Sequence, residues 1–237
     1  MIADESNQNK KKSFIEKLKG PDVKMRFQDV FKVQFALTRH PIIGTIWEDI
    51  KCKILGKSFH ISEQANGGHQ PGKDNRVDNF GMSDKTMKVS KNNILKVSSY
   101  RLGKVCNVKK NGDVSEIIRG IEKRDESFDF FSILVKRDNN NSTTYEWYVV
   151  PRDYYIFKIE PNDVRAMVGK QGSNKDEIVG WEWKYGYIRF SMSSQLWYKF
   201  DINLIQQFRI HSIELNNSCP IVDYSTLFNL MNDNGLI

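Results

Sequence analysis

The chain is poor in cysteine and lacks long apolar runs. Its three cysteines, Cys52, Cys106 and Cys219, are odd in number and far apart, and no two form a CxxC pair. This spacing argues against a disulfide framework and a structural zinc site, and it favours the reducing cytoplasm. The polar N-terminus has no apolar signal core, and no stretch approaches about 18 apolar residues. We therefore expect neither secretion by a signal peptide nor a transmembrane span.

Several catalytic motifs are also absent. The sequence contains no GxxxxGK[ST], no GxGxxG after a strand, no GxSxG and no HExxH. This argues against a nucleotide-driven motor, a dinucleotide oxidoreductase, an α/β-hydrolase and a zincin. The 237 residues are 39% hydrophobic, which is ample for a buried core.

The positive charge is concentrated in one segment. The chain carries a formal net charge of +7, but residues 51–110 hold 13 Lys or Arg and only 4 Asp or Glu. That segment alone therefore carries about +9, and the rest of the chain sums to about −2. Such a field attracts a polyanion, although a solvated basic face has the same composition. Nucleic acid is the partner that this distribution favours.

The pattern predicts an α/β fold with a mixed central sheet flanked by helices. An apolar stripe with Trp47 and Ile50 between Pro41 and Gly56 predicts one helix, and Asp113 with Glu116 predicts the capped start of another over about 114–125. Strands are expected at 128–136, 145–150 and 154–159, a short helix at 161–168, and hairpins over 74–89 and 178–192.

The expected chemistry lies in the first hairpin. A glycine-rich turn over residues 67–73 leads into Asp74, and Ser83, Asp84 and Lys85 follow on the next strand. Alternation in a strand places residues 83 and 85 on one face and residue 84 on the other, and antiparallel pairing brings Asp74 beside Lys85. A carboxylate suits Mg²⁺, and a lysine can orient the attacking water and offset phosphate charge.

These features resemble the PD-(D/E)XK nuclease superfamily, and within it the type II restriction endonucleases. The resemblance covers about residues 44–135. It rests on the helix with Trp47-Glu48, the GGHQPGKD turn ending at Asp74, the following Lys85, and the SSYRL stretch that ends at Leu102. It implies a restriction endonuclease-like core and Mg²⁺-dependent, sequence-specific hydrolysis of double-stranded DNA that leaves a 5′ phosphate.

The sequence departs from the family pattern at two positions. Lys73 replaces the proline expected before the first acid, and Ser83 replaces the second acid, two residues before Lys85. The second carboxylate can come from a helix, a bulge can bring Asp84 into the site, or the position can be degenerate. We favour a helix carboxylate and expect Glu48, Asp74, Ser83 and Lys85 to form the catalytic site, with Asp74 and Glu48 as metal ligands. The other candidates for the second acid are Glu63, Glu116 and Glu122.

Groups suited to DNA contact lie around this hairpin. Hydroxyls, an arginine and further basic groups bind phosphates and base edges, although an ordinary strand-to-loop segment has the same residues. His69 can carry a proton beside a metal or simply cap a loop. The expected DNA contacts are His69, Ser98, Ser99, Tyr100, Arg101 and Lys104. The aromatic residues between Trp181 and Phe190 can stack on bases, but their alternation is more typical of packing.

The sequence thus predicts a cytoplasmic, Mg²⁺-dependent endonuclease of a restriction system. Residues 1–24 are expected to be a flexible or partly helical lead-in, and residues 25–237 a single nuclease domain with its catalytic core at about 44–160. A homodimer is expected because a two-fold pair can cut both strands of a palindrome. The resemblance also implies a cognate methyltransferase in the same system. An inactive DNA-binding protein and a repair or modification-dependent nuclease stay open as alternatives.

Overall fold

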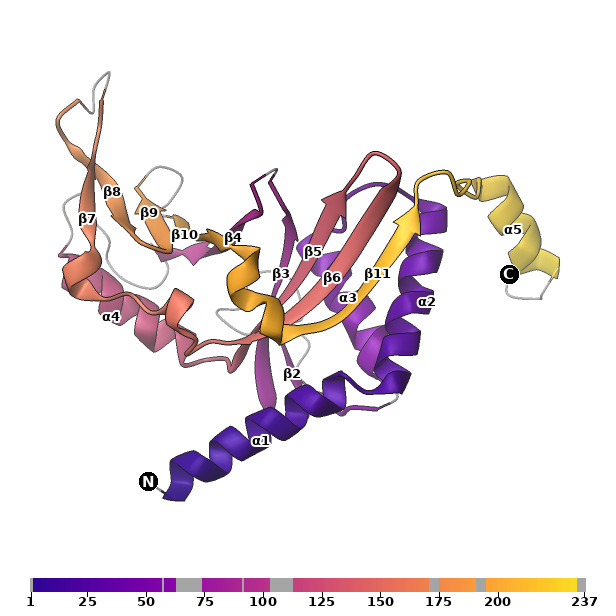
Figure 1. Ribbon diagram of the computed structural model, residues 1–237, viewed down its shortest axis with the longest axis horizontal. Coiled ribbons are helices and arrows are strands. Elements are labelled where there is room, and N and C mark those ends of the chain that lie inside the picture. Colours follow the sequence, from indigo (N-terminus) through magenta and orange to yellow (C-terminus); the bar gives the residue numbers. More distant parts are fainter. Residues whose placement is uncertain are drawn as a thin grey trace.

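A six-stranded mixed sheet occupies the middle of the computed structural model, which describes residues 2–56, 58–62, 74–90, 92–102, 113–170, 175–190 and 195–233 (Figure 1). Strands β3 and β5 are parallel, and every other neighbouring pair in this sheet is antiparallel. In spatial order the strands are β1 (Ile61–Ser62), β2 (Asn75–Val77), β3 (Phe80–Lys88), β5 (Phe130–Asp138), β6 (Ser142–Pro151) and β11 (Arg209–Asn216).

Three helices, α1 (Ile2–Leu18), α2 (Pro21–Leu37) and α3 (Gly44–Leu55), pack on one face of this sheet. Helix α2 starts at Pro21, whose fixed φ suits a first helical turn. Its buried residues Val23, Phe27, Phe31 and Phe35 recur every four positions and form one apolar stripe. They share a core with Phe14 and Leu18 of α1 and with Trp47 of α3, so all three helices are anchored to the sheet.

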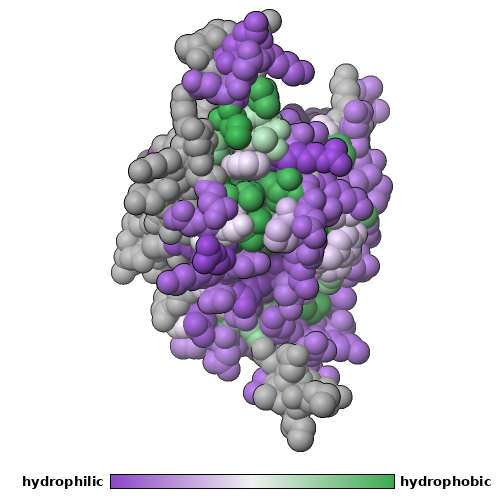
Figure 2. Space-filling view, turned by 90° about the vertical axis from the view of Figure 1, so that its left-hand side faces the viewer, coloured by the Kyte–Doolittle hydropathy of each residue, from purple (hydrophilic) through white to green (hydrophobic). Residues whose placement is uncertain are grey.

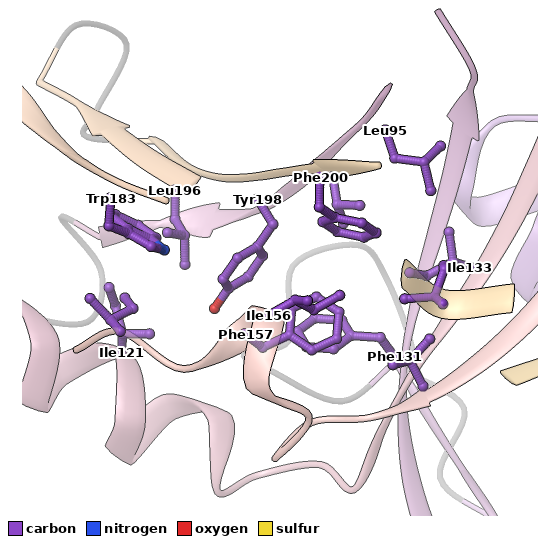
Figure 3. Close-up of a cluster of buried hydrophobic side chains, with 14 of the residues drawn as sticks. Leu95, Ile121, Phe131, Ile133, Ile156, Phe157, Trp183, Leu196, Tyr198 and Phe200 are labelled. Carbon is purple, nitrogen blue, oxygen red and sulfur yellow. The ribbon is translucent and has the colours of Figure 1, made fainter. Parts of the chain in front are cut away.

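The opposite face is covered by a second, antiparallel sheet and by α4 (Val114–Asp125) (Figure 1). In Figure 3, Trp183, Leu196, Tyr198 and Phe200 of the second sheet point toward Ile121 of α4 and the Phe131 region of the central sheet. These side chains belong to the second core of the molecule. The second sheet consists, in spatial order, of β4 (Ile94–Arg101), β10 (Gln195–Asp201), β9 (Gly186–Arg189), β8 (Ile178–Trp183) and β7 (Arg165–Val168).

The mixed α/β class, with a mixed central sheet flanked by helices, is confirmed. The helices predicted after Pro41 and after Asp113 are both present, and the Asp113 carboxylate accepts a hydrogen bond from the N–H of Ser115. The two hairpins are also present as β2–β3 and β8–β9. The separate five-stranded sheet was not expected, because strand pairing between distant segments leaves no local sequence signal.

Two local predictions are wrong. The strand expected at 154–159 is a 3₁₀ turn over Tyr155–Phe157. Two residues of this turn, Ile156 and Phe157, are buried in the second core, where Phe157 packs on Phe131 and Tyr198. The short helix expected at 161–168 is a 3₁₀ turn only over Pro161–Asp163, after which Arg165–Val168 forms β7 by pairing with β8.

The remaining elements lie at the periphery. A 3₁₀ helix over Ile202–Phe208 leads into β11, and α5 (Tyr224–Asp233) projects beyond α2 at the C-terminal end (Figure 1). The end of the molecule that carries β7, β8 and α4 is largely hydrophilic, with apolar side chains gathered in a strip among the polar ones (Figure 2). Across the described ranges, no helix combines the length and apolar character that a membrane crossing requires.

Candidate active site

The β2–β3 hairpin places Asp74 at the edge of β3. The hairpin turns at Asp78, which has a positive φ of 50°, and its regular pairing ends where Asn75 faces Met82. One residue further out, the N–H of Asp74 donates to the carbonyl of Met82 over 2.9 Å. The Asp74 carboxylate accepts a hydrogen bond of 2.5 Å from the backbone N–H of Asp84. This carboxylate is therefore fixed against the backbone of β3.

Lys85 lies beside Asp74, as the hairpin geometry predicts. Its ammonium nitrogen is 3.8 Å from Asp74 Oδ2, and the two side chains are only 15% and 23% exposed. The same ammonium donates to the hydroxyl of Ser83 over 2.9 Å and to the carbonyl of Asp84 over 3.0 Å. Ser83 and Lys85 thus share one face of the strand, and Ser83 holds the lysine instead of supplying a carboxylate.

A second lysine lies on the opposite face of β3. The ammonium of Lys51, on α3, is 2.6 Å from both carboxylate oxygens of Asp84, and both side chains are fully buried. Asn75 completes this group, since its amide donates to Asp84 over 2.7 Å and its carbonyl oxygen accepts from Lys51 over 2.8 Å. The buried charges therefore satisfy one another, as burial in a core requires.

Glu48 lies one helical turn before Lys51 on α3 and is half-buried. Its pKa is raised to about 7, first by burial and then by the negative charges of Asp74 and Asp84, while Lys51 and Lys85 act in the opposite direction. Among the described residues, the Glu48 carboxylate has neither a hydrogen bond nor an ion pair. Burial is also the main cause that raises the pKa of Asp74. Burial thus makes both carboxylates resist ionisation, and the charge of Asp74 adds to this effect at Glu48.

Of the three helix acids considered that the structure describes, Glu48 is the one whose pKa is raised by the charge of Asp74. The bulge that would bring Asp84 into the site is wrong, because β3 pairs with β5 in unbroken register and Asp84 points to Lys51. Glu116 and Glu122 are exposed on α4, the helix that packs in the other core. Glu63 lies outside the described residues.

The expected DNA contacts fall on β4 or outside the described residues. Ser98 accepts a hydrogen bond from the Gln195 amide over 2.9 Å, Ser99 is partly buried, and Arg101 is exposed at the end of the strand. These residues belong to the second sheet, whereas Lys85 belongs to the central sheet and Asp74 directly precedes β2 of that sheet. The side chain of Tyr100, with His69 and Lys104, lies outside the described part of the chain.

Lys51 and Asn75 are the site residues that the sequence reasoning missed. A signal for Lys51 was present, because it interrupts the apolar stripe of its own helix, four residues after Trp47 and three before Ile54. A lysine at such a position must be paired when it is buried. Asn75 carries no comparable signal, since its role depends on contacts across the hairpin and to α3.

The site contains three carboxylates and two ammonium groups. In the ranges that the structure describes, no three His, Cys, Asp or Glu residues are arranged to hold a metal ion. Asp84 is engaged by Lys51, so Asp74 and Glu48 are the two carboxylates left for a ligand. Mg²⁺ is commonly bound by one or two carboxylates, with waters and substrate phosphates as its other ligands. A pair of half-buried acids with raised pKa values fits that demand, because a divalent cation would relieve their repulsion.

In comparisons with protein-family models, with curated proteins and with solved structures, the chain has no match.

Proposed function

We propose that this chain is a Mg²⁺-dependent endonuclease that hydrolyses phosphodiester bonds in double-stranded DNA. One observation carries the proposal. Glu48 is an acid without a partner among the described residues, its pKa is raised to about 7 by burial and by the charges of Asp74 and Asp84, and Asp74 lies 3.8 Å from the Lys85 ammonium. Two neighbouring acids and one lysine suit metal-assisted attack of water on a phosphate. The basic segment over residues 51–110 supports DNA as the substrate.

Each residue has a distinct part in this mechanism. Asp74 and Glu48 would hold the ion, which when bound offsets phosphate charge and lowers the pKa of a water molecule. Lys85, 3.8 Å from Asp74, orients the attacking water and contacts the phosphate. Ser83 keeps the Lys85 ammonium in place through its 2.9 Å hydrogen bond. The buried pair of Lys51 and Asp84 fixes α3 against β3, so Glu48 keeps its position relative to Asp74.

The resemblance to type II restriction endonucleases refines the proposal. On that basis the enzyme has a restriction endonuclease-like core, cuts at a short specific sequence in the cytoplasm, and leaves a 5′ phosphate. It acts as a homodimer, because a two-fold pair presents one site to each strand. A cognate methyltransferase would protect the host DNA.

A second candidate is a DNA-binding protein that has the fold but no activity. Ser83 favours this candidate, since it occupies the position where the nuclease family has an acid. A nuclease for repair or for modified DNA would share the site and differ in its substrate.

Digestion of phage DNA tests the proposal. Purified protein is incubated with Mg²⁺ or with EDTA, beside Asp74→Ala and Lys85→Ala, with the exposed neighbours Asp49→Ala and Lys88→Ala as matched controls. Discrete bands that require Mg²⁺, persist in both controls and vanish in both site variants support the proposal. DNA binding without cleavage would overturn it and favour the inactive protein.

A further inference from the structure

The second sheet has a basic outer face. Its inner residues, such as Leu196 and Tyr198, are buried against the rest of the protein, so the alternate positions face outward. Exposed or half-buried on this side are Lys96, Ser98, Tyr187, Arg189, Trp197 and Lys199. We call these six residues the outer face. They come from β4, β9 and β10, three strands that are neighbours in the sheet.

Two lysines stand directly opposite each other on this face. Lys199 of β10 pairs in register with Lys96 of β4. Like charges at directly opposed positions of an antiparallel pair destabilise a sheet. Within the described residues, neither ammonium forms a salt bridge or a hydrogen bond that would offset this repulsion. The free protein thus retains an unfavourable juxtaposition that a bound polyanion would relieve.

A third cation is held beside this pair. Tyr187 and Trp197 face each other across β9 and β10, with ring centroids 6.3 Å apart and planes inclined by 15°. The guanidinium of Arg189 lies 5.8 Å from the centre of the Tyr187 ring. The stacked pair lies between Arg189 on one side and Lys96 with Lys199 on the other, and the contact with Tyr187 holds the Arg189 guanidinium at this surface.

The outer face is hollowed. A cavity of about 550 Å³ opens there, and its walls include Lys96, Arg189 and Lys199. Two acids also line it. The Asp201 carboxylate caps the following 3₁₀ helix by accepting from the N–H of Asn203, and Glu182 stands in register with Arg165 of β7. Positive charge therefore dominates where the strands β4, β9 and β10 meet.

We propose that the outer face binds the phosphate backbone of duplex DNA. Lys and Arg side chains that form no salt bridge within the described residues and line a hollow are suited to phosphate oxygens, and such contacts position a duplex without reading its sequence. Duplex is favoured over single strand because the Tyr187 and Trp197 rings already cover each other, which leaves less ring surface for unpaired bases. The inference takes DNA as the polyanion from the proposed function, but it concerns binding alone and requires no cleavage.

The test compares two double variants that remove the same charge. Lys96→Gln/Lys199→Gln alters the outer face, and Lys24→Gln/Lys32→Gln alters exposed positions on α2. Binding of a fluorescent duplex of about 30 base pairs is followed by anisotropy in EDTA, over a range of NaCl concentrations. We expect the slope of log Kd against log salt to fall by about two for the outer-face variant and to stay unchanged for the α2 variant.

Equal losses in both variants, or no loss in either, would overturn the inference, and so would tighter binding of a single strand of the same length. The outer-face variant should melt no lower than the wild type, because it removes a repulsion, so a folding defect is separable from a binding defect. A protein that shows the expected slopes but never cuts DNA would refute the proposed function alone. If the protein cuts DNA but its affinity for the duplex is the same with and without Lys96 and Lys199, this inference alone is refuted.

Discussion

Lys51 and Asp84 form an ion pair of 2.6 Å in which both side chains are fully buried. This pair connects α3, which carries Glu48, to β3, which carries Lys85. A buried ion pair contributes little net stability compared with an apolar pair, but it tolerates the loss of one partner badly. Its value here is positional, since it sets the distance between the helix acid and the strand residues of the candidate site.

Removal of the Lys51 ammonium should destabilise the protein strongly. Lys51→Ala leaves the Asp84 carboxylate buried with Asn75 as its one remaining side-chain partner in the described part of the chain, so we expect the free energy of unfolding to fall by about 3–5 kcal/mol. Urea denaturation followed by circular dichroism measures this. Lys53→Ala, at an exposed position of the same helix, should change stability by less than about 0.5 kcal/mol. Equal effects of the two substitutions would refute the structural role of Lys51.

Glu48 should make stability depend on pH. Its pKa is raised from 4.5 to about 7, so the folded state holds a proton that the unfolded state has lost across that range. This contribution is fully present below about pH 4.5 and is lost as the pH rises through about 7. Glu48→Gln should therefore flatten the decline and stabilise the protein at about pH 8, by about 1–2 kcal/mol, since solvent screens a half-buried carboxylate. Urea denaturation at about pH 5 and about pH 8 tests this.

Asp49→Asn is the matched control for Glu48, because Asp49 is its exposed neighbour on α3. It should leave the pH dependence of unfolding as it is in the wild type. An unchanged pH dependence in Glu48→Gln would show that the Glu48 pKa is not raised in the folded protein.

Added Mg²⁺ should stabilise the folded protein at about pH 8. A ligand that binds only the folded state raises its stability according to concentration and affinity. Binding between Asp74 and Glu48 would also offset the burial of both carboxylates and the repulsion by Asp74 that raises the pKa of Glu48. We expect a higher melting temperature with Mg²⁺ for the wild type and a much smaller rise for Glu48→Gln and Asp74→Asn. The same rise in all three proteins would place any bound ion elsewhere.

Substitution of Gly180 tests how closely β8 and β9 of the second sheet approach each other. A Cβ added at Gly180 would lie far inside van der Waals contact with the carbonyl oxygen of Ile188 on the neighbouring strand. Gly180→Ala should therefore lower the free energy of unfolding by about 2–3 kcal/mol. Gly44→Ala, in the first turn of α3 with open space around it, should be neutral or slightly stabilising. Unfolding in urea compares the two variants, and a neutral Gly180→Ala would mean that β8 and β9 are not held this closely.

The sequence predicted the local features of the candidate site better than its long-range ones. Alternation along one strand and the length of one turn suffice to place Asp74 beside Lys85 and Ser83 on the same face. The buried pair of Lys51 with Asp84 depends on how α3 crosses β3, and no local pattern encodes that angle. The pairing of β4 with β10 joins segments about a hundred residues apart. Its register is set by side chains that meet only in the folded chain.

Single-turnover cleavage of DNA tests most directly whether Glu48 supplies the acid missing at Ser83. Rates are measured with saturating Mg²⁺ for the wild type, Glu48→Gln and Asp49→Asn, after circular dichroism has confirmed that each is folded. We predict Mg²⁺-dependent cleavage by the wild type, an unchanged rate for Asp49→Asn, and a loss of about 100-fold or more for Glu48→Gln, as expected when a metal ligand or its charge is removed. Cleavage by Glu48→Gln at the wild-type rate would show that Glu48 does not supply this acid, and no cleavage by the wild type would show that the protein is not this nuclease.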